Sequence, residues 1–136
     1  MTEPPPALAL PQGTLDDVLG FSFGHADSES ARGHFEVTDR VRQPFGIVHG
    51  GAYAAMAETL ASVATYMQVK DEGNIAVGQS NHTSFLRPVS EGTIRAEARR
   101  RHRGRTSWVW EVDFTDEQGR LCALTRVTMA VRPAPS

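Results

Sequence analysis

The sequence has one cysteine, little net charge and no signal-peptide pattern, and each shortage excludes a class of protein. Cys122 is alone among 136 residues, so an internal disulfide is excluded and one thiolate cannot form a metal site by itself. A formal net charge of −2 gives no bulk attraction to nucleic acid or to membranes. With 40% hydrophobic residues, the composition predicts a soluble globular protein, and the cysteine content agrees with a cytoplasmic location.

The N-terminal segment, MTEPPPALALPQG, lacks the basic start and apolar core of a signal peptide. We predict a disordered, proline-rich leader over residues 1–13 and one domain over residues 14–133, without internal repeats. The histidines are scattered and show no metal-ligand spacing: His25, His34, His49, His82 and His102. We therefore expect no metal.

A long helix is predicted over residues 51–69, the stretch GAYAAMAETLASVATYMQV. Apolar residues recur there at spacings of three and four, as a stripe of Tyr53, Met56, Leu60, Val63 and Met67. Small and hydroxyl residues form a second stripe with one acid: Gly51, Ala54, Ala55, Glu58, Ser62 and Thr65. Neither stripe has the lysines and arginines of a surface helix, so we expect protein to cover both faces. The polar Glu58 and Gln68 argue against a membrane span.

Glu58 is the only charged residue of this predicted helix. A carboxylate on a covered face is costly to desolvate, so a sequence that keeps one usually pairs it or uses it. One interpretation is therefore a functional carboxylate. The alternative is a glutamate at a solvent-filled gap between subunits.

The remaining sequence predicts strands. Phe35 and Val37 alternate with polar neighbours, and the same alternation fills residues 94–101, 107–114 and 121–131, with Trp108 and Trp110 on the core side. Three antiparallel strands with one apolar face need a cover, and the long helix is the only candidate. We predict an α+β fold in which one antiparallel sheet curls around one buried central helix.

The loop before the helix ends in His49-Gly50-Gly51. Glycines let backbone N–H groups approach a ligand, and a helix start directs unpaired N–H groups and positive dipole outward. This pattern is typical of a site for a carbonyl oxygen that gains negative charge, although a plain turn is the alternative. Glu58 lies about two helical turns further on, roughly 10 Å along the axis. Both groups could serve one site only if a second chain supplied one of them or if the substrate spanned the gap.

Two segments, RQPFGIVHGGAYAAMAE and GQSNHTSFLRPVSEG, resemble the hotdog-fold acyl-CoA thioesterases. The resemblance is strongest to 4-hydroxybenzoyl-CoA thioesterases of the Arthrobacter type and extends to the enterobactin-proofreading and phenylacetate-pathway enzymes. It covers residues 37–133. It implies the hotdog fold, an antiparallel sheet wrapped around a long central helix, which agrees with the fold predicted from periodicity.

The resemblance also implies catalytic roles. Glu58 matches the family's carboxylate, as nucleophile or general base. Gly50 matches the glycine whose N–H polarises the thioester carbonyl, and Gln43 the amide beside it. Ser62 matches a hydroxyl that holds water or carboxylate, and His49 the histidine that supports the loop. In this family such a site lies across a dimer interface, usually within a dimer of dimers, which would resolve the separation between Gly50 and Glu58.

Contacts to coenzyme A are implied less completely. Arg87 matches a nucleotide-binding position, and Thr106 lies at the matching hairpin. However, Arg105 stands where the most similar relatives have a small hydroxyl residue, and the tail APS lacks their arginines. His82 either lines the site or is a structural histidine.

The arginines around this hairpin have two interpretations. Alternation places them on different faces of the sheet, which argues against a nucleic-acid patch: Arg99, Arg100, Arg101, Arg103 and Arg105. One interpretation is a solvated hairpin. In the other, some of them join Arg87 at the phosphates of coenzyme A, because the planar guanidinium suits phosphate.

The expected reaction is hydrolysis of an aromatic acyl-CoA, such as 4-hydroxybenzoyl-CoA, to free acid and coenzyme A. Coenzyme A is then part of substrate and product, and no separate cofactor is expected. Alternative substrates are 1,4-dihydroxy-2-naphthoyl-CoA, phenylacetyl-type thioesters and misacylated carrier protein. A hotdog hydratase is disfavoured because Glu58 has no histidine partner on its helix. A non-catalytic acyl-CoA binder is disfavoured by the full set of Gln43, Gly50, Glu58 and Ser62.

Overall fold

The computed structural model describes residues 11–136, and most of the predicted leader, residues 1–10, lies outside the described residues. The first element of the described residues is a short helix, α1 (Leu15–Val18), followed by the hairpin β1 (Ser22–Ala26) and β2 (Ser30–Glu36). A loop then leads to the long helix α2 (Gly50–Val69), which ends in a 3₁₀ turn, η1 (Lys70–Glu72). Four strands complete the chain: β3 (Asn74–Phe85), β4 (Thr93–Arg103), β5 (Ser107–Thr115) and β6 (Leu121–Pro133).

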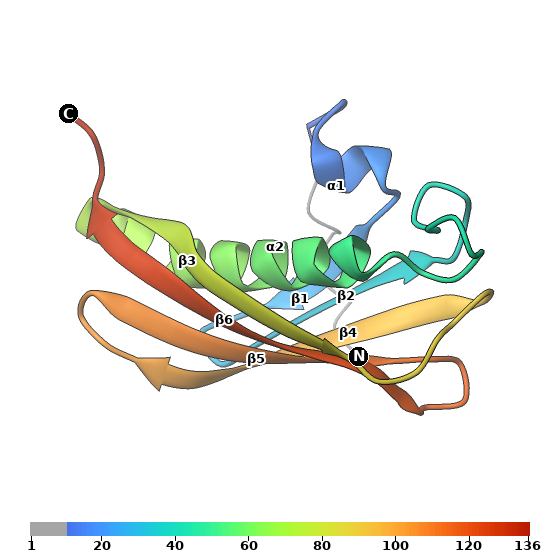
Figure 1. Ribbon diagram of the computed structural model, residues 1–136. Helices are drawn as coiled ribbons and strands as arrows, with labels where there is room; N and C mark the ends of the chain where they lie inside the picture. The colour runs from blue at the N-terminus through green and yellow to red at the C-terminus, as the bar shows by residue number, and fades with distance from the viewer. Residues whose placement is uncertain (1–10) are drawn as a thin grey trace, which may run out of the picture.

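The strands form one six-stranded antiparallel sheet in the order β1-β2-β4-β5-β6-β3. Figure 1 shows the sheet curling beneath α2, with α1 on the other side of the helix. This arrangement confirms the predicted hotdog fold. Strands β1 and β3 are the edges, and β3 pairs along its length with β6 alone.

The core lies between α2 and the concave face of the sheet. Tyr53, Met56 and Leu60 are buried on the helix, as the apolar stripe predicts. Trp108 and Trp110 are 1% and 0% exposed, so both belong to the sheet core. Burial of this many large apolar side chains is the main stabilising term of the fold.

The other face of α2 differs from the prediction. Glu58 is exposed, so in the single chain protein does not cover this face of the helix. Met67, the last residue of the apolar stripe, is also 41% exposed and so departs from the burial predicted for that stripe. Thr65, in the same small-residue stripe as Glu58, is fully buried as predicted and accepts a hydrogen bond from Trp110 Nε1 at 2.9 Å. The sheet reaches only as far as its edge strand β3, and the helix surface beyond that edge is open to solvent.

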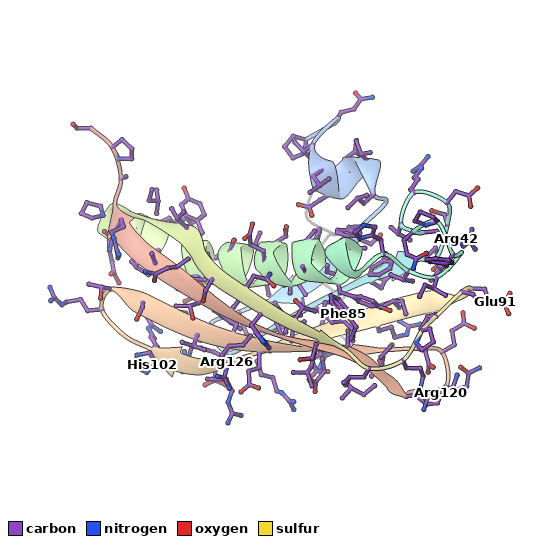
Figure 2. The ribbon with its side chains drawn as sticks, viewed as in Figure 1. Arg42, Phe85, Glu91, His102, Arg120 and Arg126 are labelled. Carbon is purple, nitrogen blue, oxygen red and sulfur yellow. The ribbon has the colours of Figure 1, made fainter. Side chains whose placement is uncertain are left out.

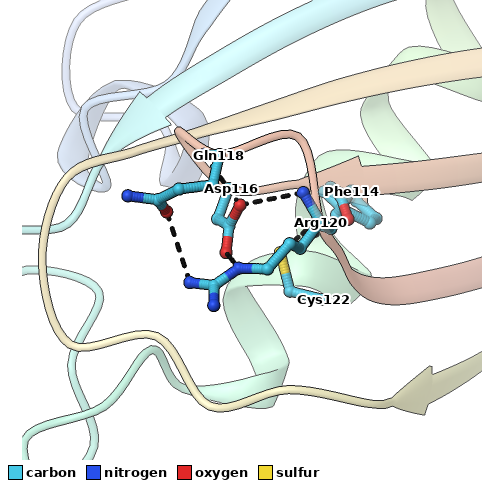
Figure 3. Close-up of polar contacts among 5 residues, drawn as sticks. All are labelled: Phe114, Asp116, Gln118, Arg120 and Cys122. Carbon is cyan, nitrogen blue, oxygen red and sulfur yellow. Dashed lines mark hydrogen bonds and ion pairs between the residues drawn. The ribbon is translucent and has the colours of Figure 1, made fainter.

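The β5–β6 turn, TDEQGR, is closed by one buried carboxylate. Asp116 accepts hydrogen bonds from the backbone N–H groups of Gln118 (3.0 Å) and Arg120 (2.9 Å), and its Oδ2 pairs with Arg120 Nε at 2.8 Å (Figure 3). Nearby, the buried thiol of Cys122 donates to the Phe114 carbonyl at 3.3 Å.

No helix within residues 11–136 is long and apolar enough to cross a membrane.

Candidate functional site at the start and the middle of helix α2

The loop before α2 is a compact turn that fixes where the helix begins. An isolated bridge joins Arg42 to Val48, and Gln43 N–H donates to the Ile47 carbonyl at 2.9 Å. Gly46 has φ +86°, a left-handed conformation that favours glycine. His49 N–H then donates to the Val41 carbonyl at 2.7 Å, which anchors the residue immediately before the helix.

His49 is the N-cap of α2. Its Nδ1 accepts a hydrogen bond from Gly51 N–H at 2.8 Å, and its carbonyl accepts one from Ala52 N–H at 2.9 Å. Within residues 11–136, Gly50 N–H donates no hydrogen bond. The predicted support of the loop by His49 therefore has a physical basis, and one N–H at the positive end of the helix dipole remains available to a ligand.

A cavity of about 350 Å³ opens at this helix start, lined by Gln43, Gly50, Tyr53, Phe85 and Arg87 among others. The Gln43 side-chain oxygen accepts a hydrogen bond from Phe45 N–H, which holds the amide in the turn. Phe85, at the end of β3, is 60% exposed and lies below the first turns of α2 (Figure 2). The cavity thus combines apolar walls with an amide, a guanidinium and a backbone N–H.

Glu58 lies eight residues after Gly50, on the side of α2 that faces β3. Its carboxylate lies against Gly78, since a Cβ atom added there would be 2.8 Å from Glu58 Oε1. Ser62, one turn further, is half-buried, and its hydroxyl donates to Met129 Sδ at 3.7 Å. Glu58 is exposed, so its carboxylate is open to solvent beside β3, the edge strand of the sheet.

The predicted site residues lie at three separate positions in the structure. Gln43, Gly50 and Arg87 meet in the cavity at the start of α2. Glu58 and Ser62 lie in the middle of the helix, and eight residues of α-helix separate Glu58 from Gly50 by about 12 Å. One thioester carbonyl could not contact both groups of a single chain.

Arg105 and Thr106 form the third place, at the β4–β5 hairpin. Arg105 lines a cavity of about 330 Å³ with Val69 and Asn74, at the far end of α2. The Thr106 carbonyl accepts hydrogen bonds from Val131 N–H (2.9 Å) and from the Arg132 guanidinium (3.0 Å). Within one chain these residues lie at the opposite end of the helix from Arg87.

Two exposed arginines of β4 are paired with acids of β5. Arg99 contacts Asp113 at 2.9 Å and Arg101 contacts Glu111 at 3.0 Å, all of them solvent-accessible. Arg103 lies over the Trp108 ring, 4.6 Å from its centroid. These contacts agree with the solvated-hairpin interpretation.

His82 is exposed on β3 opposite Arg126, on a strand without any alternation of burial. Sequence reasoning missed Gly78, Phe85 and Tyr53 as neighbours of the site. A glycine inside a strand was the one available signal, because such a residue often marks a bulge or a close approach.

Among residues 11–136, no group of three or more His, Cys, Asp or Glu side chains is arranged to hold a metal ion.

Comparison with known proteins identifies the family. The model of the thioesterase superfamily matches residues 45–123, which include the end of the loop before α2, the helix, strands β3 to β5 and the first residues of β6. The chain belongs to the thioesterase superfamily. It is a hotdog-fold thioester hydrolase, and proteins of this superfamily act on acyl thioesters.

Individual members of the thioesterase superfamily are similar over most of their length. The proofreading thioesterase EntH of Cronobacter turicensis is 41% identical over 119 residues, which cover 88% of this chain and 86% of the relative. The solved structure of a mutant thioesterase PA1618 from Pseudomonas aeruginosa is 36% identical, with a TM-score of 0.85 and coverage of 90% and 88%.

A third relative, SAV0944 from Staphylococcus aureus, has been solved in two mutant forms, each 28% identical to this chain. In one, alanine replaces a glutamine (TM-score 0.83, covering 88% of this chain and 98% of that one). In the other, alanine replaces a glutamate (TM-score 0.84, covering 88% and 99%).

Proposed function

We propose that this thioesterase hydrolyses an aromatic acyl-CoA of the 4-hydroxybenzoyl-CoA kind to free acid and coenzyme A. The observation that carries the proposal is that α2 presents two incomplete sites, which we call half-sites: one at Gly50 and one at Glu58. Gly50 offers an N–H without an acceptor in the described chain, inside a cavity with Gln43 and an exposed aromatic ring. Glu58 offers an exposed carboxylate further along the same helix.

The two half-sites become one site if two chains pair about a two-fold axis. Strand β3 has one unpaired edge twelve residues long, on which Val77 is 49% and Phe85 is 60% exposed. A long edge with apolar side chains is a ready surface for pairing with a second copy. Antiparallel pairing of two β3 strands would run the two α2 helices in opposite directions, so that the start of one helix faces the middle of the other.

In this arrangement the thioester carbonyl oxygen would accept hydrogen bonds from Gly50 N–H and the Gln43 amide of one chain. These donors stabilise the negative charge that develops on the oxygen during attack. Glu58 of the other chain would act on the carbonyl carbon. Ser62, one turn after Glu58 on the same helix, would hold the attacking water or the carboxylate.

Two routes fit these groups, and both end in free acid and coenzyme A thiol. In the first, a Glu58 oxygen attacks the carbonyl carbon, the C–S bond breaks to release the coenzyme A thiolate, and water hydrolyses the resulting mixed anhydride. In the second, Glu58 removes a proton from water, the hydroxide attacks, and the thiolate leaves with the proton. Neither route needs a cofactor besides the coenzyme A of the substrate.

We assign the coenzyme A phosphates to Arg87, with Arg105 and Thr106 at the far hairpin as further candidates. Arg87 lines the cavity of Gly50, and its guanidinium suits a phosphate geometrically. Arg105 and Thr106 could join the same ligand only from another chain, since they lie at the other end of α2. His82 is exposed on β3 and is a candidate for the rim of the site.

The spacing of two residues supports the assignment of Gln43 and Glu58. They are fifteen residues apart, and the glutamine and glutamate replaced in the two SAV0944 structures are also fifteen residues apart. Similarity to a proofreading thioesterase supports a second candidate function, the hydrolysis of incorrectly loaded thioesters such as misacylated carrier protein.

The test is release of free thiol from a panel of substrates. The panel contains benzoyl-CoA, 4-hydroxybenzoyl-CoA, phenylacetyl-CoA, 1,4-dihydroxy-2-naphthoyl-CoA, a straight-chain acyl-CoA and a benzoylated carrier protein. We expect the highest kcat/KM on the benzoyl-type CoA thioesters. A preference for the carrier-bound substrate would favour proofreading, and a preference for the straight chain would reject the aromatic assignment.

The same assay tests the role of Glu58. Removing a nucleophile or general base typically lowers kcat by about 10²–10⁴-fold, so we expect Glu58→Ala and Glu58→Gln to fall in this range. Glu29→Ala is the matched control, because Glu29 is an exposed glutamate at the distant β1–β2 turn. Native activity in both Glu58 variants would reject the proposed chemistry.

A further inference from the structure

Gly78 lies in the interior of β3, next to a register shift in the pairing with β6. Its φ angle is outside the left-handed region that favours glycine, which holds six other glycines of the described chain. Glycine in a strand interior weakens the strand, because it has more freedom to lose and no side chain to pack. A left-handed backbone conformation therefore does not explain this glycine.

The space above Gly78 is filled by the Glu58 side chain. A Cβ atom at residue 78 would lie 2.8 Å from Glu58 Oε1, 3.2 Å from its Cδ and 3.4 Å from its Cγ. These are the three nearest atoms, and all belong to the outer part of one flexible side chain. The absence of a side chain at residue 78 is thus what allows the Glu58 carboxylate to lie on the strand.

Contacts with β6 and with α2 hold this part of β3 in place. Gly78 pairs with Met129, the residue whose sulfur accepts from the Ser62 hydroxyl, and the register shifts between Gly78 and Ser80. Three residues after Gly78, Asn81 Nδ2 donates to the Ala54 carbonyl at 2.9 Å. Ala54 precedes Glu58 by one helical turn, so this bond joins β3 to the turn that ends in the carboxylate.

We propose that Gly78 is a positioning residue for thioester hydrolysis, and that its missing side chain sets the place of the Glu58 carboxylate. The inference rests on the proposed role of Glu58. A methyl group at residue 78 would push the carboxylate away from β3 and leave the cavity at Gly50 unchanged. Displacements near 1 Å at a reacting group can lower a rate by about 100-fold.

The expected effect is on turnover and not on folding. The atoms that would have to move are the end of an exposed side chain, which can shift at little cost to stability. We expect Gly78→Ala to lower kcat by about 10-fold to 100-fold, with KM changed less than 3-fold. The melting temperature and the oligomeric mass should stay those of the native protein.

The matched control is Gly24→Ala. Gly24 is also an exposed strand glycine beside a register shift, but a Cβ atom there would be 3.9 Å from the Arg32 carbonyl oxygen, an ordinary contact. This variant should keep native kcat. A loss in both variants would point to a general effect of alanine in the sheet and would overturn the proposal.

A double substitution separates positioning from any other effect of residue 78. Aspartate is one methylene shorter than glutamate, so Glu58→Asp withdraws the carboxylate from residue 78. The proposal predicts that Gly78→Ala, which lowers kcat in the native background, has less than a 2-fold effect in the Glu58→Asp background. The same fold-loss in both backgrounds would overturn it.

The outcomes also distinguish this inference from the proposed function. Full activity of Glu58→Ala would reject the proposed function itself. An inactive Glu58→Ala together with native kcat in Gly78→Ala would reject the positioning role alone.

Discussion

The ring of Phe85 lies over the Cα atom of Gly50, so close that a Cβ atom at residue 50 would be 2.6 Å from Cζ of the ring. The contact joins the end of β3 to the first residue of α2. The same ring lies 6.3 Å from the Tyr53 ring, centroid to centroid. Phe85 thereby connects the helix start to the apolar wall of the cavity.

This contact predicts the outcome of Gly50→Ala. The variant keeps the N–H at residue 50 but forces the Phe85 ring away from the helix start, so the cavity changes shape. We expect kcat/KM to fall by about 10-fold to 100-fold. Adding Phe85→Leu should recover part of the loss because the smaller side chain leaves room for the methyl group. Native activity in Gly50→Ala alone would show that the close contact has no bearing on the site.

The hydrogen bond from Trp110 Nε1 to the Thr65 hydroxyl predicts a loss of stability in Thr65→Val. Both residues are fully buried, and valine keeps the shape of threonine but offers no acceptor. An unsatisfied buried donor costs about 1–3 kcal/mol, which chemical denaturation should show as a lower free energy of unfolding. Thr65→Ser keeps the acceptor, so the Trp110 indole N–H resonance should stay near its native position in that variant. An unchanged resonance in Thr65→Val would contradict the assigned bond.

Asp27 predicts a dependence of stability on acid pH. Its carboxylate accepts hydrogen bonds from Glu29 N–H and, at its other oxygen, from His25, and also from Ser30 N–H. These bonds lower the pKa of Asp27 to about 2. Since the folded pKa is depressed, the contribution is present above the unfolded pKa of about 4 and is lost as pH falls through about 2.

The check for Asp27 is twofold. NMR titration of the carboxylate should give a midpoint near pH 2. In Asp27→Asn, the fall in stability between about pH 4 and pH 2 should be smaller than in the native chain. A titration midpoint near 4 would contradict the hydrogen-bonded turn.

The sequence predicts best those strands that have one face on the helix. In β5, buried and half-buried residues alternate along the whole strand, and this alternation is visible in the residue types themselves. Strand β3 has no such pattern, because as an edge strand it is exposed along most of its length. Its position at the edge depends on pairing with β6, a long-range contact that local periodicity does not encode.

Only part of the candidate site can be predicted from the sequence, because local residue types and helix spacing are encoded in one segment and contacts between segments are not. The residue types at Gly50 and Glu58 pointed to the chemistry, and the helix between them set their separation. The prediction that Glu58 lies on a covered face was wrong for the single chain, because a face of small residues resembles a buried face whether a sheet or open solvent lies beside it. The roles of Gly78 and Phe85 depend on packing between β3 and α2, which neither segment shows alone.

In the proposed dimer, one active site takes Gln43 and Gly50 from one chain and Glu58 from another. The most direct test of this arrangement is a heterodimer of Glu58→Ala with Gln43→Ala, made by co-expression with two different tags and purified by both. If the sites cross the interface, the heterodimer has one intact site of two and regains about half of native kcat, whereas each homodimeric variant is impaired. If each site lies within one chain, every site lacks one group and the heterodimer stays as impaired as the homodimers, which would contradict the account.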